Sequence, residues 1–361
     1  MPKLPQVRKA TLTKPFPARN DRASQLYGEP IIRMFWNENH LGMSPKAKAA
    51  MEKAMERGHF YHDFSSTALK ERLAKEYRLS QDNVYTAAGS SAIILDIGTV
   101  YLDPGDEVVY CDPTFGDFWD MIVFNGAVPV KVPVTEKEQK FDLDGILAAL
   151  TEKTKIIVIC NPNNPTGTAL THKEIEEFAA KVPEEILIVI DEAYMDYASD
   201  PDVRTAIDLV DRYNILVLRT FSKMYGMAGI RTGYAIAKAD IIDNFMRCAG
   251  GYNTSAIAMA GAIAALDDTE HRDRVYAMVK SERERLAKEL RRLGCTVWDS
   301  QASFVYFDCG IDPEELFTLM MSRNLRMGAF PHSRISVATP ELNDLFLQYL
   351  AEFMAARKSG S

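Results

Sequence analysis

The chain has 361 residues, 47% of them hydrophobic, and its 42 basic and 50 acidic side chains leave a formal net charge of −8. This length favours two domains, or one large α/β unit with a smaller satellite, over a single compact core. The negative charge argues against a nucleic-acid partner, and the absence of a long apolar run argues against a membrane partner.

The first third of the chain predicts an arm followed by helices and short strands. Residues 1–33 are polar and interrupted by prolines, which is typical of an arm that lies on another part of the structure. Ser44-Pro45 opens a helix, with Ser44 as N-cap and the proline in the first turn. The helices expected here span 44–57, 67–77 and 93–100, and the strands span 83–86, 106–111 and 128–134.

Three continuous apolar runs follow, at residues 155–160, 186–190 and 215–218, with a helix expected at 173–181. Strands that are apolar on both faces and separated by helices indicate a mainly parallel sheet covered on both sides. From about residue 249 the pattern changes to helices at 255–266 and 272–293 and short strands at 296–298, 304–307 and 334–337. We therefore expect an α/β fold with a large domain at 34–248. The arm (1–33) and residues 249–361 would form a smaller α+β domain.

Polar side chains follow each of the three apolar runs. Asn164 follows the first, Asp191 and Tyr194 the second, and Lys223 and Arg231 the third. Each cluster alone also fits ordinary turn and cap chemistry. Together they would meet at the carboxyl edge of the sheet, where open α/β folds place their sites. A lysine amine there can form a Schiff base with a phosphorylated aldehyde, while Ser222 and Arg231 take its phosphate.

These residues carry a family resemblance. The segments 161–167, 191–194 and 222–231, the turn at 103–107 and the late segment 334–339 resemble the fold-type I, class I/II aminotransferases that depend on pyridoxal phosphate. The likeness runs from about Asn37 to Leu347 and is greatest to the histidinol-phosphate aminotransferase branch. It implies a homodimer that exchanges an amino group between a small-molecule amino donor and a 2-oxo acid acceptor.

The resemblance also implies a role for each site residue. Lys223 would carry pyridoxal 5'-phosphate and act as the base, with Asp191 on the pyridine nitrogen and Asn164 and Tyr194 on the phenolic oxygen. Phe115 would stack on the ring. The phosphate would be held by Gly89, Ser90, Ser91, Ser222 and Arg231, with Tyr61 reaching in from the partner subunit. Tyr61 is equally compatible with a core position.

Substrate recognition is where the sequence departs from the branch. Arg334 matches the arginine that clamps the substrate carboxylate or phosphate, and Asn39 and Trp36 lie in the segment that faces the substrate. The branch usually has a second arginine where Gly328 stands, and Arg326, two positions earlier, is a possible substitute. Phe35, Trp36, Phe115, Phe118 and Trp119 form either an aromatic pocket or, for several of them, part of the core.

The sequence therefore predicts an aminotransferase for histidinol phosphate, with a broad aromatic amino-acid aminotransferase as the alternative. A lyase such as a threonine-phosphate decarboxylase would share every cofactor residue, whereas a non-catalytic regulator is disfavoured because Lys223 is present. Five cysteines without close spacing and six histidines without a ligand pattern indicate reduced thiols and no metal. No signal peptide is visible, so we expect a cytoplasmic protein.

Overall fold

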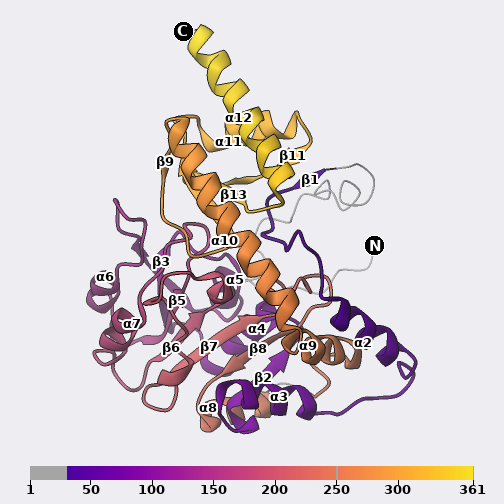
Figure 1. Ribbon diagram of the computed structural model, residues 1–361. Helices are drawn as coiled ribbons and strands as arrows, with labels where there is room; N and C mark the ends of the chain where they lie inside the picture. The colour runs from indigo at the N-terminus through magenta and orange to yellow at the C-terminus, as the bar shows by residue number, and fades with distance from the viewer. Residues whose placement is uncertain (1–30, 249–250, 361) are drawn as a thin grey trace, which may run out of the picture.

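The computed structural model describes residues 31–248 and 251–360, and its centre is a seven-stranded sheet (Figure 1). The strand order is β2-β8-β7-β6-β5-β3-β4. The five strands from β7 to β4 pair in parallel, and β8 is antiparallel to both β7 and β2. The strands are β2 (Val84–Ala87), β3 (Glu107–Asp112), β4 (Val128–Pro133), β5 (Thr154–Cys160), β6 (Leu187–Asp191), β7 (Ile215–Thr220) and β8 (Gly233–Ile236). The predicted mainly parallel sheet is confirmed.

Helices cover both faces of this sheet because consecutive residues of the central strands are apolar, so that both faces of each strand are apolar. In β5, Ile156 and Val158 pack on one side and Ile157 and Ile159 on the other. The first side is covered by α4 (Ser90–Tyr101), α5 (Asp117–Phe124) and α8 (Ala239–Cys248). The core on the other side includes residues of α2 (Pro45–Met55), α3 (Thr67–Tyr77), α6 (Leu143–Ala148), α7 (His172–Ala179) and α9 (Ala256–Leu266).

A second, smaller sheet has the order β12-β13-β10-β9 and is antiparallel throughout. It consists of β9 (Thr296–Val297), β10 (Phe304–Asp308), β12 (Gly328–Ala329) and β13 (Ser333–Ser336), and it lies with α10 (Thr269–Arg292), α11 (Pro313–Met321) and α12 (Pro340–Gly360). A two-stranded parallel sheet of β1 (Ile32–Arg33) and β11 (Leu325–Arg326) ties the start of the described chain to this part. The expected smaller α+β unit is therefore present.

Most predicted elements form within three residues of their expected ends, and several others were missed. The missed ones include β8, α5, α8, α11 and α12.

The domain boundary near residue 249 stays a prediction, and residues 249–250 lie outside the described residues, as does most of the arm. The helix α9 packs against α2 and α3, so the chain passes from the large to the small body along α10 (Figure 1). None of the helices in the described part of the chain combines the length and apolar character needed to cross a bilayer.

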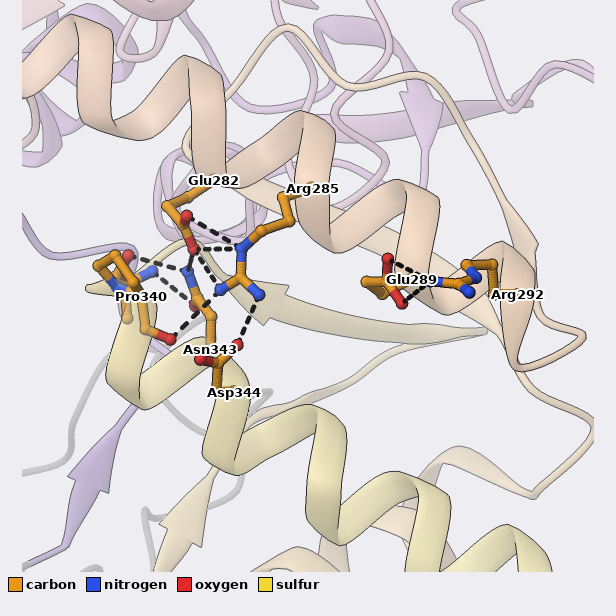
Figure 2. A network of polar contacts seen from close by, with 8 residues as sticks. Glu282, Arg285, Glu289, Arg292, Pro340, Asn343 and Asp344 are labelled. Carbon is orange, nitrogen blue, oxygen red and sulfur yellow. Dashed lines mark hydrogen bonds and ion pairs between the residues drawn. The ribbon is translucent and has the colours of Figure 1, made fainter.

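A polar network fastens α12 to α10 (Figure 2). The Asn343 side chain is completely buried, and its amide nitrogen donates to Glu282 at 2.7 Å and to the carbonyl of Ala338 at 2.9 Å. Its amide oxygen accepts from the Ala338 N–H at 3.1 Å. Arg285 in turn binds both Glu282 and Asp344. The network therefore holds the backbone of Ala338, two residues after the end of β13, in place.

We expect Asn343→Ala to lower the free energy of unfolding by about 2 to 3 kcal/mol, because it leaves buried donors and acceptors without partners. Urea denaturation followed by circular dichroism measures this difference. The matched control is Gln348→Ala on the same helix, where the side chain is exposed and donates to Glu352. Equal losses for the two variants would contradict a role for the buried network.

Candidate active site

Three neighbouring parallel strands, β5, β6 and β7, end at one edge of the large sheet, and a cavity of about 240 Å³ opens there. Their parallel registers bring Asn164, Asp191 and Lys223 to the same cavity. The lining residues are Arg33, Trp36, Glu38, Ser90, Ser91, Phe115, Cys160, Asn164, Asp191, Ala193, Tyr194, Thr220, Ser222, Lys223, Ala228 and Arg231. Nine of the eleven residues expected to bind the cofactor thus line one cavity, the exceptions being Gly89 and Tyr61.

Lys223 lies in the loop directly after β7. Its Nζ donates to the carbonyl oxygen of Trp36 at 2.7 Å and lies 5.4 Å from the centre of the Tyr194 ring. Burial, and after it the positive charge of Arg334, lowers the pKa of Lys223 to about 8. A much larger share of the amine is therefore neutral, and so nucleophilic, near pH 7 than for an exposed lysine.

Asp191 is the last residue of β6 and is buried. Its Oδ1 accepts the N–H of Ala193 at 3.0 Å. Burial raises the pKa of Asp191 to about 7. A carboxylate in this position keeps its charge most easily when a cation faces it, which is what a protonated ring nitrogen would provide.

Tyr194 and Asn164 lie beside the lysine with their polar atoms already oriented. The hydroxyl oxygen of Tyr194 accepts from the side-chain amide of Asn37 at 2.9 Å. Burial raises the pKa of Tyr194, so its hydroxyl stays protonated and can donate. The side-chain oxygen of Asn164 accepts from Arg334, which leaves its amide N–H groups for another partner.

An anion cradle forms where the amino end of α4 meets the loop after β7. Gly89 is the N-cap of α4, and Ser90 and Ser91 are its first residues, so unpaired N–H groups and the positive end of the helix dipole face the cavity. Arg231 Nη1 donates to Ser222 Oγ at 3.3 Å and to the carbonyl of Ala228 at 2.9 Å. These groups suit a phosphate.

Gly89 permits this cradle. Its φ is +91°, and a Cβ atom there would lie 2.4 Å from Nη2 of Arg231. We expect Gly89→Ala to displace the guanidinium and weaken cofactor binding about ten-fold or more, measured by equilibrium dialysis of the apoenzyme. Gly105→Ala is the matched control, because Gly105 has a φ of +97° but no atom within 4 Å of the added Cβ. If both variants lost the same affinity, backbone strain and not the lost arginine contact would be the cause.

Three of the expected substrate residues, Trp36, Arg326 and Arg334, alternate with the rings of Phe35 and Phe330, and Trp36 of these three lines the cavity. The guanidinium of Arg326 lies 4.6 Å from the ring of Trp36 and 5.1 Å from that of Phe35. Arg334 lies 5.5 Å from Phe35 and 4.6 Å from Phe330. Within the described residues, the buried Nε atoms of both arginines have no hydrogen-bond partner. Burial lowers the pKa of Arg334 to about 10.

Other expected positions turn out differently. The side chain of Asn39 does not line the cavity, because its amide donates to the carbonyl of Met224 and so supports the Lys223 loop. Of the five aromatic residues expected in a pocket or in the core, Phe118 lies in the core, whereas Trp119 is in neither and is 39% exposed on the surface. The core reading of Tyr61 is wrong, because this side chain is 87% exposed.

Sequence reasoning assigned no role to several lining residues. Arg33 and Glu38 are joined by an ion pair of 2.6 Å, and the Arg33 guanidinium lies 4.4 Å from the ring of Trp36. Their opposite charges five positions apart, on either side of Trp36, were a usable signal. Cys160 and Thr220 end the strands β5 and β7, so their positions follow from the strand assignments alone.

Fold and site together are those of the fold-type I transferases that depend on pyridoxal phosphate. Residues 29–350 match the model of the family described as aminotransferase class I and II, and the chain belongs to this family. It is therefore a transaminase of the pyridoxal-phosphate-dependent type.

Proteins that are similar to this chain are named as aminotransferases. The chain is 32% identical to a histidinol-phosphate aminotransferase of Moorella thermoacetica, over 98% of this chain and 94% of that protein. It is 34% identical to one of Brevibacillus brevis, over 90% of each. The structure of a Sinorhizobium meliloti histidinol-phosphate aminotransferase in complex with pyridoxal-5'-phosphate gives a TM-score of 0.90 at 28% identity, covering 98% of this chain and 99% of that one. Aspartate aminotransferase from Thermus thermophilus with maleate shares the fold (TM-score 0.85, 22% identity, covering 97% and 100%).

The donor set fits pyridoxal phosphate by charge and by shape. An amine with a lowered pKa, a buried carboxyl with a raised pKa and an anion cradle surround one cavity. Phe115 supplies an aromatic wall. Among the residues that the structure describes, no group of three or more histidine, cysteine or acidic side chains is placed to hold a metal ion.

Proposed function

We propose that this chain transfers the amino group of histidinol phosphate to 2-oxoglutarate, giving imidazole acetol phosphate and glutamate. The observation that carries the proposal is a pair of arginines, the half-buried Arg326 and the buried Arg334, whose guanidinium groups lie 5.1 Å and 5.5 Å from the ring of Phe35. The Nε atoms of both have no hydrogen-bond partner among the described residues, and two guanidinium groups beside the same ring suit an anionic group, either the phosphate of the donor or a carboxylate of glutamate. The relatives named histidinol-phosphate aminotransferase support the same substrate.

The lining residues that were expected to bind the cofactor then have defined tasks. When bound, pyridoxal phosphate supplies an aldehyde for the amine and a ring that accepts electron density from the reacting carbon. Lys223 Nζ removes the proton from the substrate carbon that bears the amino group. Asp191 would hold a proton on the ring nitrogen, while Tyr194 and Asn164 would donate to the phenolic oxygen. Ser90, Ser91, Ser222 and Arg231 would hold the phosphate and so fix the orientation of the ring.

A panel of amino donors tests the substrate. The purified holoenzyme is mixed with histidinol phosphate, glutamate, phenylalanine or tyrosine, and the absorbance of the bound cofactor is followed. We expect histidinol phosphate and glutamate to react with the highest kcat/KM. Arg326→Leu should raise KM for histidinol phosphate about ten-fold or more. Reaction with phenylalanine and none with histidinol phosphate would overturn the proposal.

The aromatic wall favours one alternative donor class. Trp36 and Phe115 line the cavity, and Phe35 stacks in parallel with Phe330 at 6.5 Å between ring centres. An aromatic amino acid would find an apolar surface there, with Arg334 for its carboxylate. The donor panel separates this function from the first one, and release of carbon dioxide would reveal a lyase.

We also propose a homodimer in which Tyr61 completes the phosphate site of the partner subunit. Tyr61 belongs to an exposed aromatic cluster with Phe64 and Tyr252. Mixing the inactive variant Lys223→Ala with a weakly binding Tyr61→Phe variant tests this, since a hybrid dimer would contain one intact site. Activity that does not rise on mixing would contradict a shared site.

The odd number of cysteines, all free, fits the expected cytoplasmic location.

The pKa of Lys223 can be measured without the cofactor. In the apoenzyme, trinitrobenzenesulfonate reacts only with neutral amines, and a lowered pKa makes Lys223 reactive at lower pH. We expect labelling of the peptide that contains Lys223 to rise about ten-fold per pH unit up to about pH 8 and then level off. A rate that continues to rise steeply to pH 10 would contradict the lowered pKa. In Lys223→Arg, the labelling that levels off at about pH 8 should be absent, which assigns this labelling to the Lys223 amine.

A further inference from the structure

Two cysteines face each other across the hairpin of β9 and β10. The ladder pairs Thr296 with Asp308 in antiparallel register. The next position outward along both strands brings Cys295 opposite Cys309. Both are free thiols, Cys295 buried and Cys309 half-buried.

The hydrogen-bond pattern shows which kind of cross-strand position this is. The N–H of Trp298 donates to the carbonyl of Tyr306 at 3.2 Å, so these two residues form a hydrogen-bonded pair. Antiparallel ladders alternate between hydrogen-bonded and non-hydrogen-bonded pairs. Counting outward, the two cysteines occupy a non-hydrogen-bonded pair, where facing Cα atoms are about 4.5 Å apart and side chains are closest. That separation lies within the range that a disulfide spans.

The two thiols have unequal environments. The Cys295 thiol donates a hydrogen bond to the Cys309 sulfur, and the N–H of Ile311 donates to the same sulfur, which together lower the pKa of Cys309. The hydrogen bond that Cys295 donates, and after it burial, raises the pKa of the Cys295 thiol. Cys309 is half-buried whereas Cys295 is buried, so a peroxide reaches Cys309 first, and Cys309 is the nucleophile of the pair and Cys295 the thiol that resolves it.

We propose that Cys295 and Cys309 form a reversible intramolecular disulfide in response to hydroperoxides. The Cys309 thiolate attacks the peroxide oxygen, which breaks the O–O bond and leaves Cys309 as a sulfenic acid, while the other oxygen leaves as an alcohol or water. Cys295 then attacks the Cys309 sulfur, the S–S bond forms and water leaves. In total, two thiols and one hydroperoxide give one disulfide, one alcohol and one water, and a dithiol reverses the oxidation.

A disulfide in this hairpin would also affect neighbouring parts of the fold, because the hairpin contacts both the active-site segment and α10. Its loop docks on the segment that carries Asn164, since the N–H of Gln301 donates to the carbonyl of Gly167 at 2.8 Å. The N–H of Cys295 donates to the carbonyl of Leu290 in the last turn of α10. The disulfide would close the hairpin into a ring and limit its opening, which stabilises the fold chiefly by restricting the unfolded chain.

The test is a titration of the holoenzyme with hydrogen peroxide, followed by thiol counting and a non-reducing peptide map. We expect loss of two of the five thiols, a cross-linked peptide containing Cys295 and Cys309, and full recovery with dithiothreitol. The melting temperature of the oxidised protein should rise by about 5 °C. Amide exchange in residues 296–308 should slow on oxidation.

Two variants complete the test. Cys309→Ser should lose the cross-link and the rise in melting temperature, whereas Cys248→Ser, which removes an exposed thiol elsewhere, should keep both. The proposal is overturned if Cys309→Ser still loses two thiols at the same peroxide concentration. It is equally overturned if the wild type accumulates sulfinic acid at Cys309 with no cross-link. Neither result bears on the proposed transaminase activity.

Discussion

Lys223→Ala is expected to lower the transamination rate by about 10⁴-fold or more, while the protein still folds. The variant loses the amine that holds the cofactor covalently and the base that moves the substrate proton. Its Nζ makes one hydrogen bond to the protein, to the carbonyl of Trp36, among the contacts of the described residues, so its removal costs little stability. Steady-state kinetics with histidinol phosphate and 2-oxoglutarate measure the loss, and the melting temperature verifies folding.

Two controls separate chemistry from packing. Lys223→Arg keeps a cation of similar length but no amine, and should be as inactive as the alanine variant. Lys173→Ala removes a lysine that is 83% exposed on α7, and should leave the rate unchanged. Borohydride treatment of the holoenzyme followed by peptide mapping should label Lys223 alone. Turnover near the wild-type rate in Lys223→Ala would show that another group acts as the base.

The catalytic half of the site was predictable because it depends on local pattern. The strands β5, β6 and β7 are continuous apolar runs, and each is followed within a few residues by its polar side chains. Neighbouring parallel strands end at a common edge, so Asn164, Asp191 and Lys223 had to meet there. The short strand β8 was missed because it is only four residues long and follows directly on the loop that carries Arg231.

The substrate side was harder because it depends on contacts between distant segments. Arg326 reaches Phe35 and Trp36 because β11 pairs with β1, and the two strands are nearly 300 residues apart in sequence. In the smaller sheet, Gly328 lies directly opposite Arg334. Because residue 328 is a glycine, the position where the branch usually has its second arginine offers no side chain here. Tyr61 has the same difficulty in a stronger form, since its expected contacts lie in a second copy of the chain.

Asp191→Asn is expected to lower kcat by about 10³-fold, because an amide cannot keep a proton on the ring nitrogen as a carboxylate does. The substitution conserves shape, and the new side-chain oxygen can still accept the N–H of Ala193. The loss therefore reports charge and not packing. Asp191→Glu, which keeps the charge on a longer side chain, should retain more activity than Asp191→Asn.

The same substitution has a second signature in the apoenzyme. The folded-state pKa of Asp191 is raised to about 7, so the folded chain binds this proton more tightly than the unfolded chain does. The stability that this provides is complete below about pH 4 and is lost as the pH rises through 7, a total fall of roughly 4 kcal/mol. In Asp191→Asn this fall should be absent, so urea denaturation at pH 5 and pH 8 should show a smaller difference for the variant. If wild type and variant have parallel pH profiles and equal kcat, Asp191 is not the residue that controls the ring charge.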